Sequence, residues 1–125
     1  MPVTQEEFAT FVANLESNQD MSLESHTLRS VHAVLGMAGE TGEIVDHIKK
    51  VFVYKGFEFE RGYAVEELGD LFYYMTLLMN VHGITLDEVR DANMRKLQVR
   101  YPDGYSHERA INRNHAVERA AMEAR

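Results

Sequence analysis

The stretch LGMAGETGEIVDHIKK, residues 35–50, combines apolar side chains at helical spacing with three glycines that recur every third residue. A glycine inside a helix costs roughly 1 kcal/mol relative to alanine. Glu40 and Glu43 lie among these glycines and are also three residues apart, so a helix here projects both carboxylates from one face. The stretch therefore predicts a helix that accepts weak helix formers in exchange for close backbone approach and a charged site.

Helical spacing of apolar residues recurs in three other segments of the chain. Thr4 and Thr85 are each followed three residues later by a glutamate, the capping-box pattern that opens a helix, and Gly83 is placed to end a helix. We predict helices from about residue 5, over about 28–55, over 63–82 and over 85–100, with loops at 17–20 and 56–62 and a turn at 102–104. Because no strand pattern is present, the sequence predicts an all-α, four-helix-type bundle.

The length of 125 residues fits a single domain with a sizeable core. We predict one helical domain over 1–125, with its core at about 5–100 and a polar, weakly periodic tail at 101–125. The chain has no cysteine, which excludes disulfides and thiolate metal sites. No apolar run approaches the ~20 residues of a membrane span, and the N-terminus lacks the pattern of a secretory signal. We therefore expect a cytoplasmic protein with no membrane partner.

The net charge of −7 is unevenly distributed along the chain. Residues 1–94 carry 16 acidic and 6 basic side chains, whereas residues 95–125 carry 4 acidic and 7 basic ones. A protein that binds duplex nucleic acid needs a broad basic face, and most of this chain would repel phosphate. The charge pattern argues against duplex nucleic acid as a partner and favours a concentrated acidic site that binds metal-chelated phosphate.

Two pairs of carboxylates, Glu40 with Glu43 and Glu67 with Asp70, lie three residues apart on the second and third predicted helices. Such pairs are often only solvated helix faces. Two pairs embedded in glycine-bearing apolar helices favour a shared site instead. A di-iron carboxylate bundle would need Glu-x-x-His on two helices, and no glutamate in this chain has a histidine three residues later.

A glycine lies beside each carboxylate pair, Gly42 in one helix and Gly69 in the other. We expect these glycines to let the two backbones come close where the acids meet. Four carboxylates gathered without cations would repel one another strongly. Mg²⁺, for which Mn²⁺ can substitute, would relieve that repulsion and still hold waters and substrate phosphates.

Other polar and aromatic side chains are candidates for contact with a ligand. His47 follows Glu43 by four residues and is either a ligand or an ordinary, satisfied histidine. Tyr74 follows Asp70 by four residues and either stacks on a nucleobase or is a partly buried structural tyrosine.

The fourth predicted helix carries an amide and two cations on one face, from Asn93, Lys96 and Arg100. Lys96 and Arg100 could grip phosphate oxygens, and the arginine could do so through two parallel hydrogen bonds. The alternative is an ordinary basic helix C-terminus, which the helix dipole favours.

The blocks GETGE (39–43) and EELGD (66–70), followed by NMRKLQVRYPDGYS (93–106), together resemble the MazG-like family of all-α nucleoside triphosphate pyrophosphohydrolases. The family pattern is Glu-x-x-Glu, a spacer and Glu-x-x-Asp, and the resemblance spans about residues 28–113. It implies a helical bundle completed by oligomerisation, as a homodimer or homotetramer.

The resemblance also implies roles for individual residues. It assigns metal binding to Glu40, Glu43, Glu67 and Asp70, contact with substrate phosphates to Lys96 and Arg100, and a polar substrate contact to Asn93. Some family members carry a basic residue one or two helical turns before the second acidic block. Arg61 is the nearest such residue here, and Lys49, Lys50 and Lys55 are the substitutes.

The resemblance implies metal-dependent hydrolysis of a nucleoside or deoxynucleoside triphosphate to the monophosphate and pyrophosphate, for control of the nucleotide pool. In the implied reaction, bound Mg²⁺ would lower the pKa of a water that attacks the α-phosphorus, Glu40 or Glu43 would assist its deprotonation, and Lys96 and Arg100 would neutralise the leaving pyrophosphate. Two alternatives stay open: a non-catalytic helical interaction protein, and hydrolysis of another pyrophosphate-containing ester such as a phosphoribosyl nucleotide. The base of the substrate is left undetermined.

Overall fold

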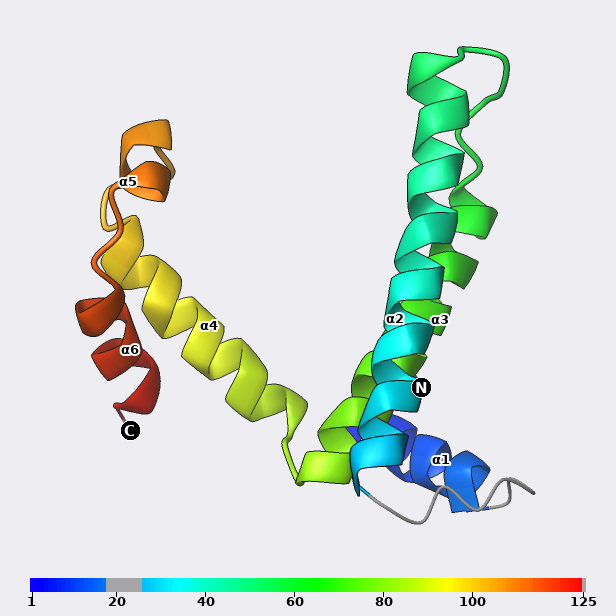
Figure 1. Cartoon of the computed structure of the whole chain (residues 1–125), viewed down its shortest axis with the longest axis horizontal. Helices are drawn as coiled ribbons and strands as arrows, with labels where there is room; N and C mark the ends of the chain where they lie inside the picture. Colours follow the sequence, from blue (N-terminus) through cyan, green and yellow to red (C-terminus); the bar gives the residue numbers. More distant parts are fainter. Residues whose placement is uncertain (18–25, 125) are drawn as a thin grey trace. The chain divides into compact units, whose positions relative to one another are not determined.

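The computed structural model describes residues 1–17 and 26–124, and the chain divides into two compact units, Met1–Gly83 and Ile84–Arg125. All regular structure in these two described ranges is helical (Figure 1), which confirms the predicted all-α class. Ser17 is the last residue of a helix, and the rest of the loop predicted at 17–20 lies outside the described residues. The single domain predicted for 1–125 stays a prediction.

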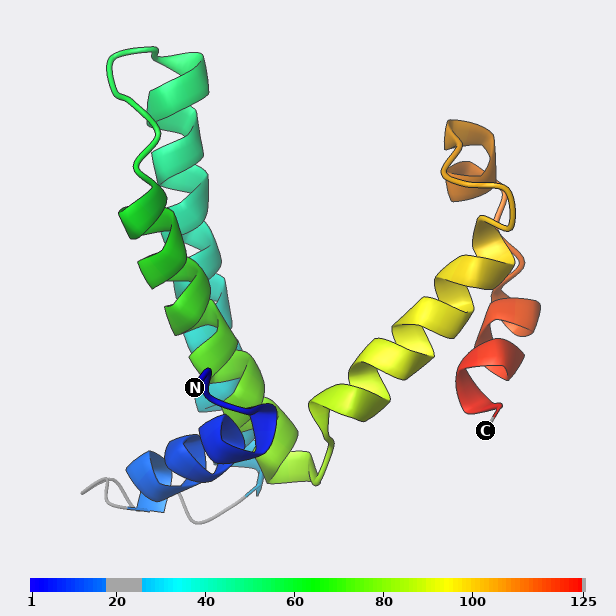
Figure 2. The ribbon, with the colours of Figure 1, turned by 180° about the vertical axis from the view of Figure 1, so that it is seen from behind.

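The first unit is built around a helical hairpin. Its elements are α1 (Gln5–Ser17), α2 (His26–Ile48), the π-helical turn η1 (Lys49–Val53) and α3 (Arg61–His82). Helices α2 and α3 run antiparallel side by side, and α1 packs at the end where α2 begins and α3 ends (Figures 1 and 2). This arrangement leaves the far end of the hairpin to α2, η1, α3 and the segment between them.

The core of the first unit lies where α1 crosses the hairpin. Val12, Ala33, Leu77 and Val81 form a buried apolar cluster with contributions from all three helices. Polar contacts fix the same junction, because the Asn80 side-chain amide donates to the Ala9 carbonyl over 3.0 Å. The unit is therefore anchored at one end of the hairpin, and the acidic pairs predicted from sequence lie further along it.

The helix boundaries confirm the local signals in the sequence. At Thr4 and at Thr85 the hydroxyl accepts from the backbone N–H three residues on, and that residue's glutamate accepts from the threonine N–H over 2.7 Å. Gly83 ends α3 in the left-handed region, with φ +64°, which favours glycine. Capping and termination depend on neighbouring residues only, so the sequence predicts them well.

The predicted second helix is wrong in its last turn. The α-helical geometry ends at Ile48, and η1 follows as a single wider turn, in which the Tyr54 N–H donates to the Lys49 carbonyl over 3.0 Å. Helix α3 begins at Arg61, two residues earlier than predicted, so Arg61 lies in a helix and not in the preceding loop.

The glycine prediction is also wrong in its location. Apart from its chain neighbours and the backbone of its own helix, a Cβ atom added at Gly42 or Gly69 would meet no described atom within 4 Å, so these glycines do not bring α2 and α3 together. The close approach occurs at Gly36, where an added Cβ would collide with the ring of Tyr74. An aromatic ring from α3, rather than a backbone, occupies the space that this glycine leaves open.

The second unit consists of α4 (Leu86–Arg100), α5 (His107–Ile111) and α6 (His115–Glu123). Helices α4 and α6 lie side by side (Figures 1 and 2). The Arg95 guanidinium ties them together by donating to the carbonyls of Ala121 and Met122 over 3.0 and 3.1 Å. The tail that was predicted to be polar and weakly periodic therefore forms two helices, of which α6 packs on α4.

No helix among the described residues is long and apolar enough to cross a membrane. Several large apolar side chains along the first unit are nevertheless exposed. On α2 these are Leu28, Val31, Val34, Leu35, Val45 and Ile48. Completion of the bundle by a second copy of the chain stays a prediction. The exposed apolar side chains of α2 are a surface that such a copy would cover.

Candidate active site

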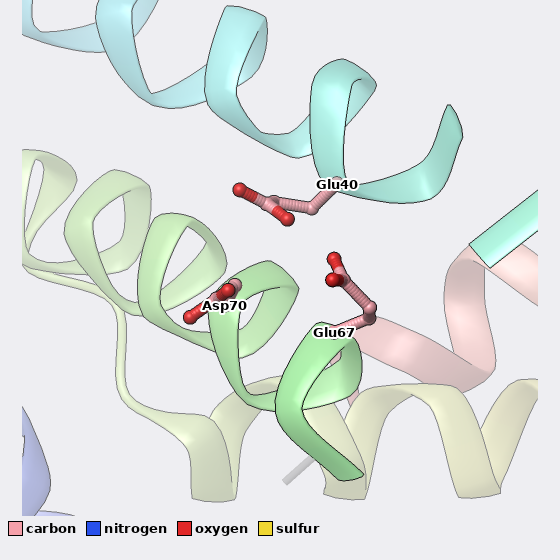
Figure 3. Close-up of side chains that lie close together, drawn as sticks. All are labelled: Glu40, Glu67 and Asp70. Carbon is pink, nitrogen blue, oxygen red and sulfur yellow. The ribbon is translucent and has the colours of Figure 1, made fainter. Parts of the chain in front are cut away.

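Three carboxylates gather between α2 and α3. One oxygen from each of Glu40, Glu67 and Asp70 lies within 4.8 Å of the others (Figure 3). Glu40 is contributed by α2, and Glu67 and Asp70 are contributed by successive turns of α3. Antiparallel packing places the two acidic blocks at the same level of the hairpin, so the spacing that the sequence shows becomes a shared site.

The three carboxylates differ in exposure and in hydrogen bonding. Glu67 is only 8% exposed, Glu40 is partly buried and Asp70 is exposed. Oε2 of Glu67 is buried and has no hydrogen-bond partner among the described residues. A buried, unpartnered carboxylate oxygen is costly, so this atom calls for a proton or a cation.

The electrostatic environment of Glu40 also favours a proton or a cation at this site. Burial raises the pKa of the Glu40 carboxyl, and a hydrogen bond with Glu67 and the charges of Asp70, Glu67 and Glu43 raise it further. The cluster therefore favours the uptake of positive charge. Carboxylate oxygens without sulfur ligands suit a hard divalent cation such as Mg²⁺ or Mn²⁺, so these three residues could hold a metal ion.

Glu43 lies outside the group of three. Its Oε2 accepts a hydrogen bond from the Tyr63 hydroxyl over 3.4 Å. Burial raises the pKa of Tyr63 to about 12, with further contributions from the charges of Glu67 and Glu43, so its hydroxyl stays protonated and can donate. The role of Glu43 as a metal ligand stays a prediction.

Tyr63 was missed in the sequence analysis, although a signal for it exists. It precedes Glu67 by four residues, so both side chains lie on one face of α3. On α2, His47 follows Glu43 by four residues, so these two side chains also lie on one helix face. The His47 ring lies 4.8 Å from the Tyr63 ring and 5.4 Å from the Phe59 ring. His47 therefore packs among aromatic rings next to the acids.

Tyr74 lies against Gly36 and makes edge contacts with two other rings. Its centroid is 5.9 Å from that of His32 and 5.1 Å from that of Tyr73. These contacts match the structural alternative for Tyr74, and its stacking on a nucleobase stays a prediction.

The basic residues predicted to bind phosphate belong to the second unit, where Arg100 has a protein partner. Arg100 Nε donates to Oε1 of Glu118 over 2.5 Å, and Arg113 Nε donates to Oε2 of the same carboxylate over 3.0 Å. Glu118 is 3% exposed, and Nη2 of Arg100 is buried with no hydrogen-bond partner in the part of the chain that the structure describes.

The two arginines determine the charge state of Glu118. Burial alone would raise the pKa of the Glu118 carboxyl, but the hydrogen bonds and charges of Arg100 and Arg113 outweigh burial and lower it. The same hydrogen bond raises the pKa of the Arg100 guanidinium. Sequence analysis missed Glu118 because its partners are 18 and 5 residues away, beyond any local pattern.

The remaining predicted basic and polar contacts are placed as follows. Asn93 is exposed and Lys96 is partly buried on α4. Lys49 and Lys50 both pair with Asp46, over 3.6 and 2.7 Å. Lys50 is thus partly neutralised within the chain, and its use on a substrate phosphate stays a prediction.

Comparison with known proteins places this geometry in context. The MazG nucleotide pyrophosphohydrolase domain matches residues 30–105, a range that includes all four predicted acids. Gene 37 protein of Mycobacterium phage L5 is 33% identical over 76 residues, which cover 58% of this chain and 67% of that protein. No solved structure matches the chain.

Proposed function

The chain belongs to the MazG nucleotide pyrophosphohydrolase family, and we propose that it hydrolyses a nucleoside triphosphate to the monophosphate and pyrophosphate. One observation carries the proposal beyond family membership. Glu40, Glu67 and Asp70 converge from two helices and take part in no ion pair among the described residues, and one buried oxygen of Glu67 has no hydrogen-bond partner there. Such a site is costly on its own and becomes favourable when it binds a cation that also binds phosphates.

The cation that suits this site best is Mg²⁺, with Mn²⁺ as a substitute, held by Glu40, Glu67 and Asp70. When bound, such an ion neutralises phosphate charge and lowers the pKa of a water molecule. The buried Oε2 of Glu67 supports this assignment independently of the family, because it is an acceptor without a donor.

Of the two glutamates that the sequence leaves open as proton acceptors, we favour Glu43. Glu40 contributes an oxygen to the group of three carboxylates, whereas Glu43 does not belong to that group, although its charge acts on Glu40. The Tyr63 hydroxyl, which stays protonated, donates to Glu43 and holds its carboxylate in place. In this proposal Glu43 takes the proton of a water that attacks the α-phosphorus.

We assign contact with the phosphates to Lys96 and Arg100, and a further polar contact to Asn93. The support for this assignment is the resemblance of residues 93–106 to the family. Arg100 already donates its Nε to Glu118 and its Nη2 is buried, so a contact with a phosphate oxygen would fall to Nη1. Control of the nucleotide pool would be the corresponding cellular role, and a homo-oligomer would cover the exposed apolar residues of α2.

The test is an assay of the full chain against a panel of ribo- and deoxyribonucleoside triphosphates, with Mg²⁺, with Mn²⁺ and with a chelator. We expect equimolar monophosphate and pyrophosphate, and no turnover in the chelator. Release of orthophosphate would contradict cleavage at the α-phosphorus. A protein that turns over no triphosphate under any of these conditions would instead fit the interaction-protein alternative, and turnover of a phosphoribosyl nucleotide alone would fit the other.

A further inference from the structure

A small hollow opens beside the carboxylates at the end of the hairpin remote from α1. It has a volume of about 180 Å³ and lies between the last turns of α2, the first turns of α3 and Phe59 of the connecting segment. Its walls are apolar and aromatic apart from His47 and Glu67. We refer to it as the aromatic hollow, defined by His47, Phe59, Tyr63, Glu67 and Leu68.

The three rings of the aromatic hollow form a connected cluster. His47 lies 4.8 Å from Tyr63 and 5.4 Å from Phe59, with interplanar angles of 46° and 50°. Phe59 is 50% exposed, so part of its surface is left for another ring. Flat, partly exposed aromatic surfaces of this kind bind planar heteroaromatic rings by stacking, with little dependence on which ring it is.

Glu67 belongs both to the wall of the aromatic hollow and to the group of three carboxylates. A ligand in the hollow is therefore adjacent to whatever the carboxylates hold. Tyr63 also touches both, because its ring lines the aromatic hollow and its hydroxyl donates to Glu43 over 3.4 Å.

The size of the hollow restricts its occupant. Pockets that enclose a whole small-molecule ligand measure about 300–1,000 Å³, so a volume of about 180 Å³ suits one ring system rather than a complete nucleotide. A neighbouring hollow of about 250 Å³ shares His47 and Tyr63. Its other charged walls are Asp46, Glu58 and Glu60 against Lys50 alone, which makes it unsuitable for phosphates.

We propose that the aromatic hollow binds the nucleobase of the triphosphate by stacking on Phe59, His47 and Tyr63, while the carboxylates hold the metal-chelated phosphates. This inference rests on the proposed function. The base is uncharged and the hollow is apolar, so binding there needs no further charge. The phosphates are then directed towards Glu67, which borders both subsites.

The experiment separates the base from the phosphates by using two probes. Titration calorimetry of the full chain with Mg²⁺ measures the Kd of an α,β-imido deoxynucleoside triphosphate, which resists cleavage, and of inorganic tripolyphosphate, which has no base. Phe59→Ala should weaken binding of the nucleotide roughly 5- to 100-fold, the usual cost of one lost base stack, and leave tripolyphosphate binding unchanged.

Phe52→Ala is the matched control. Phe52 lies in η1, is 62% exposed and does not line the aromatic hollow. It removes the same side chain from a nearby surface, so both Kd values should stay at the wild-type level. Circular dichroism of both variants checks that the helices persist.

Three results would overturn the inference. One is equal weakening of both probes by Phe59→Ala, and another is wild-type protein that binds the nucleotide no more tightly than tripolyphosphate. The third is a change of oligomeric state in Phe59→Ala with an unchanged ratio of the two Kd values, which would make the hollow a contact between copies of the chain. Failure of the proposed function is distinguishable, because it would abolish pyrophosphate release by wild type without removing the Phe59-dependent difference between the probes.

Discussion

The two units of the molecule place carboxylates in opposite electrostatic environments. In the first, Glu40, Glu67 and Asp70 share a site, none of them forms an ion pair among the described residues, and the pKa of Glu40 is raised. In the second, the buried Glu118 binds Arg100 and Arg113, one through each oxygen, and its pKa is lowered. The acids of the first unit would thus need a bound cation, whereas the acid of the second unit is neutralised by arginines of the chain itself.

This difference has a thermodynamic meaning. A group of acids that repel one another reduces the stability of the fold, so removing one should relieve it. A buried acid paired with two arginines leaves both of them uncompensated when it is removed, so its loss should destabilise. Substitution within the group of three carboxylates should therefore lower activity without lowering stability. Substitution of Glu118 should instead lower stability.

The largest expected effect is on turnover. Asp70→Asn removes one carboxylate of the three while keeping its shape, and we expect pyrophosphate release to fall by at least about 100-fold, with Tm unchanged or raised. Steady-state kinetics at saturating Mg²⁺ and a thermal melt measure the two quantities. Glu66→Gln is the control, since Glu66 is exposed on the same helix and outside the group. An active Asp70→Asn enzyme would end the assignment of this site.

The second-largest expected effect is on thermal stability rather than on turnover. Glu118→Ala leaves Arg100 and Arg113 without their shared acceptor, so Tm should fall by roughly 5–10 °C. Glu123→Ala, at an exposed position of the same helix, should change Tm by no more than about 1 °C. A Glu118→Ala protein as stable as wild type would show that the two sites do not differ in the way proposed.

Arg100 tests whether the second unit also serves the reaction. Arg100→Lys keeps the positive charge beside Glu118 but loses the planar fork, so a transition-state role on phosphate predicts a fall in kcat of about 10-fold with a smaller change in KM. Kinetics on the best triphosphate, beside a melt, measure both. Wild-type kcat together with a lowered Tm would assign Arg100 to the Glu118 pair alone.

The comparison also shows which features a sequence can predict. The capping boxes at Thr4 and Thr85 and the end of α3 at Gly83 depend on residues within one turn, and all three are confirmed. The three-residue spacing of the acids likewise fixed their helix face. Three of them converge because α2 and α3 pack side by side, although Gly42 and Gly69, from which the convergence was predicted, do not cause it.

Features that depend on contacts between distant residues were missed. The ring of Tyr74 against Gly36 joins residues 38 positions apart, and Glu118 meets Arg100 across 18 positions. A polar tail gives no local sign that one of its glutamates will be buried. The aromatic hollow beside Glu67 depends on Phe59, in a segment whose sequence indicated only a loop.

The smallest expected effect is a pH dependence with opposite signs at the two sites. For Glu40 the folded-state pKa is raised above 4.5, so its contribution to stability is present below about pH 4.5 and is lost as pH rises through the folded pKa. For Glu118 the folded-state pKa is lowered below 4.5, so its contribution is present above about pH 4.5 and is lost as pH falls through the folded pKa.

Bound metal should cancel the Glu40 effect, because a cation stabilises the ionised carboxylate. We expect 10 mM Mg²⁺ to raise Tm by about 2–5 °C near pH 7.5 and by less near pH 4.5, where protonation of Glu40 competes with the ion. Thermal melts over pH 4–8, in a chelator and in Mg²⁺, measure this difference. Glu40→Gln should remove most of it, whereas Glu118→Gln should leave the Mg²⁺ shift intact and abolish the loss of stability at acid pH. A Mg²⁺ shift that is the same at both pH values would mean that the ion binds elsewhere and that Glu40 does not take part.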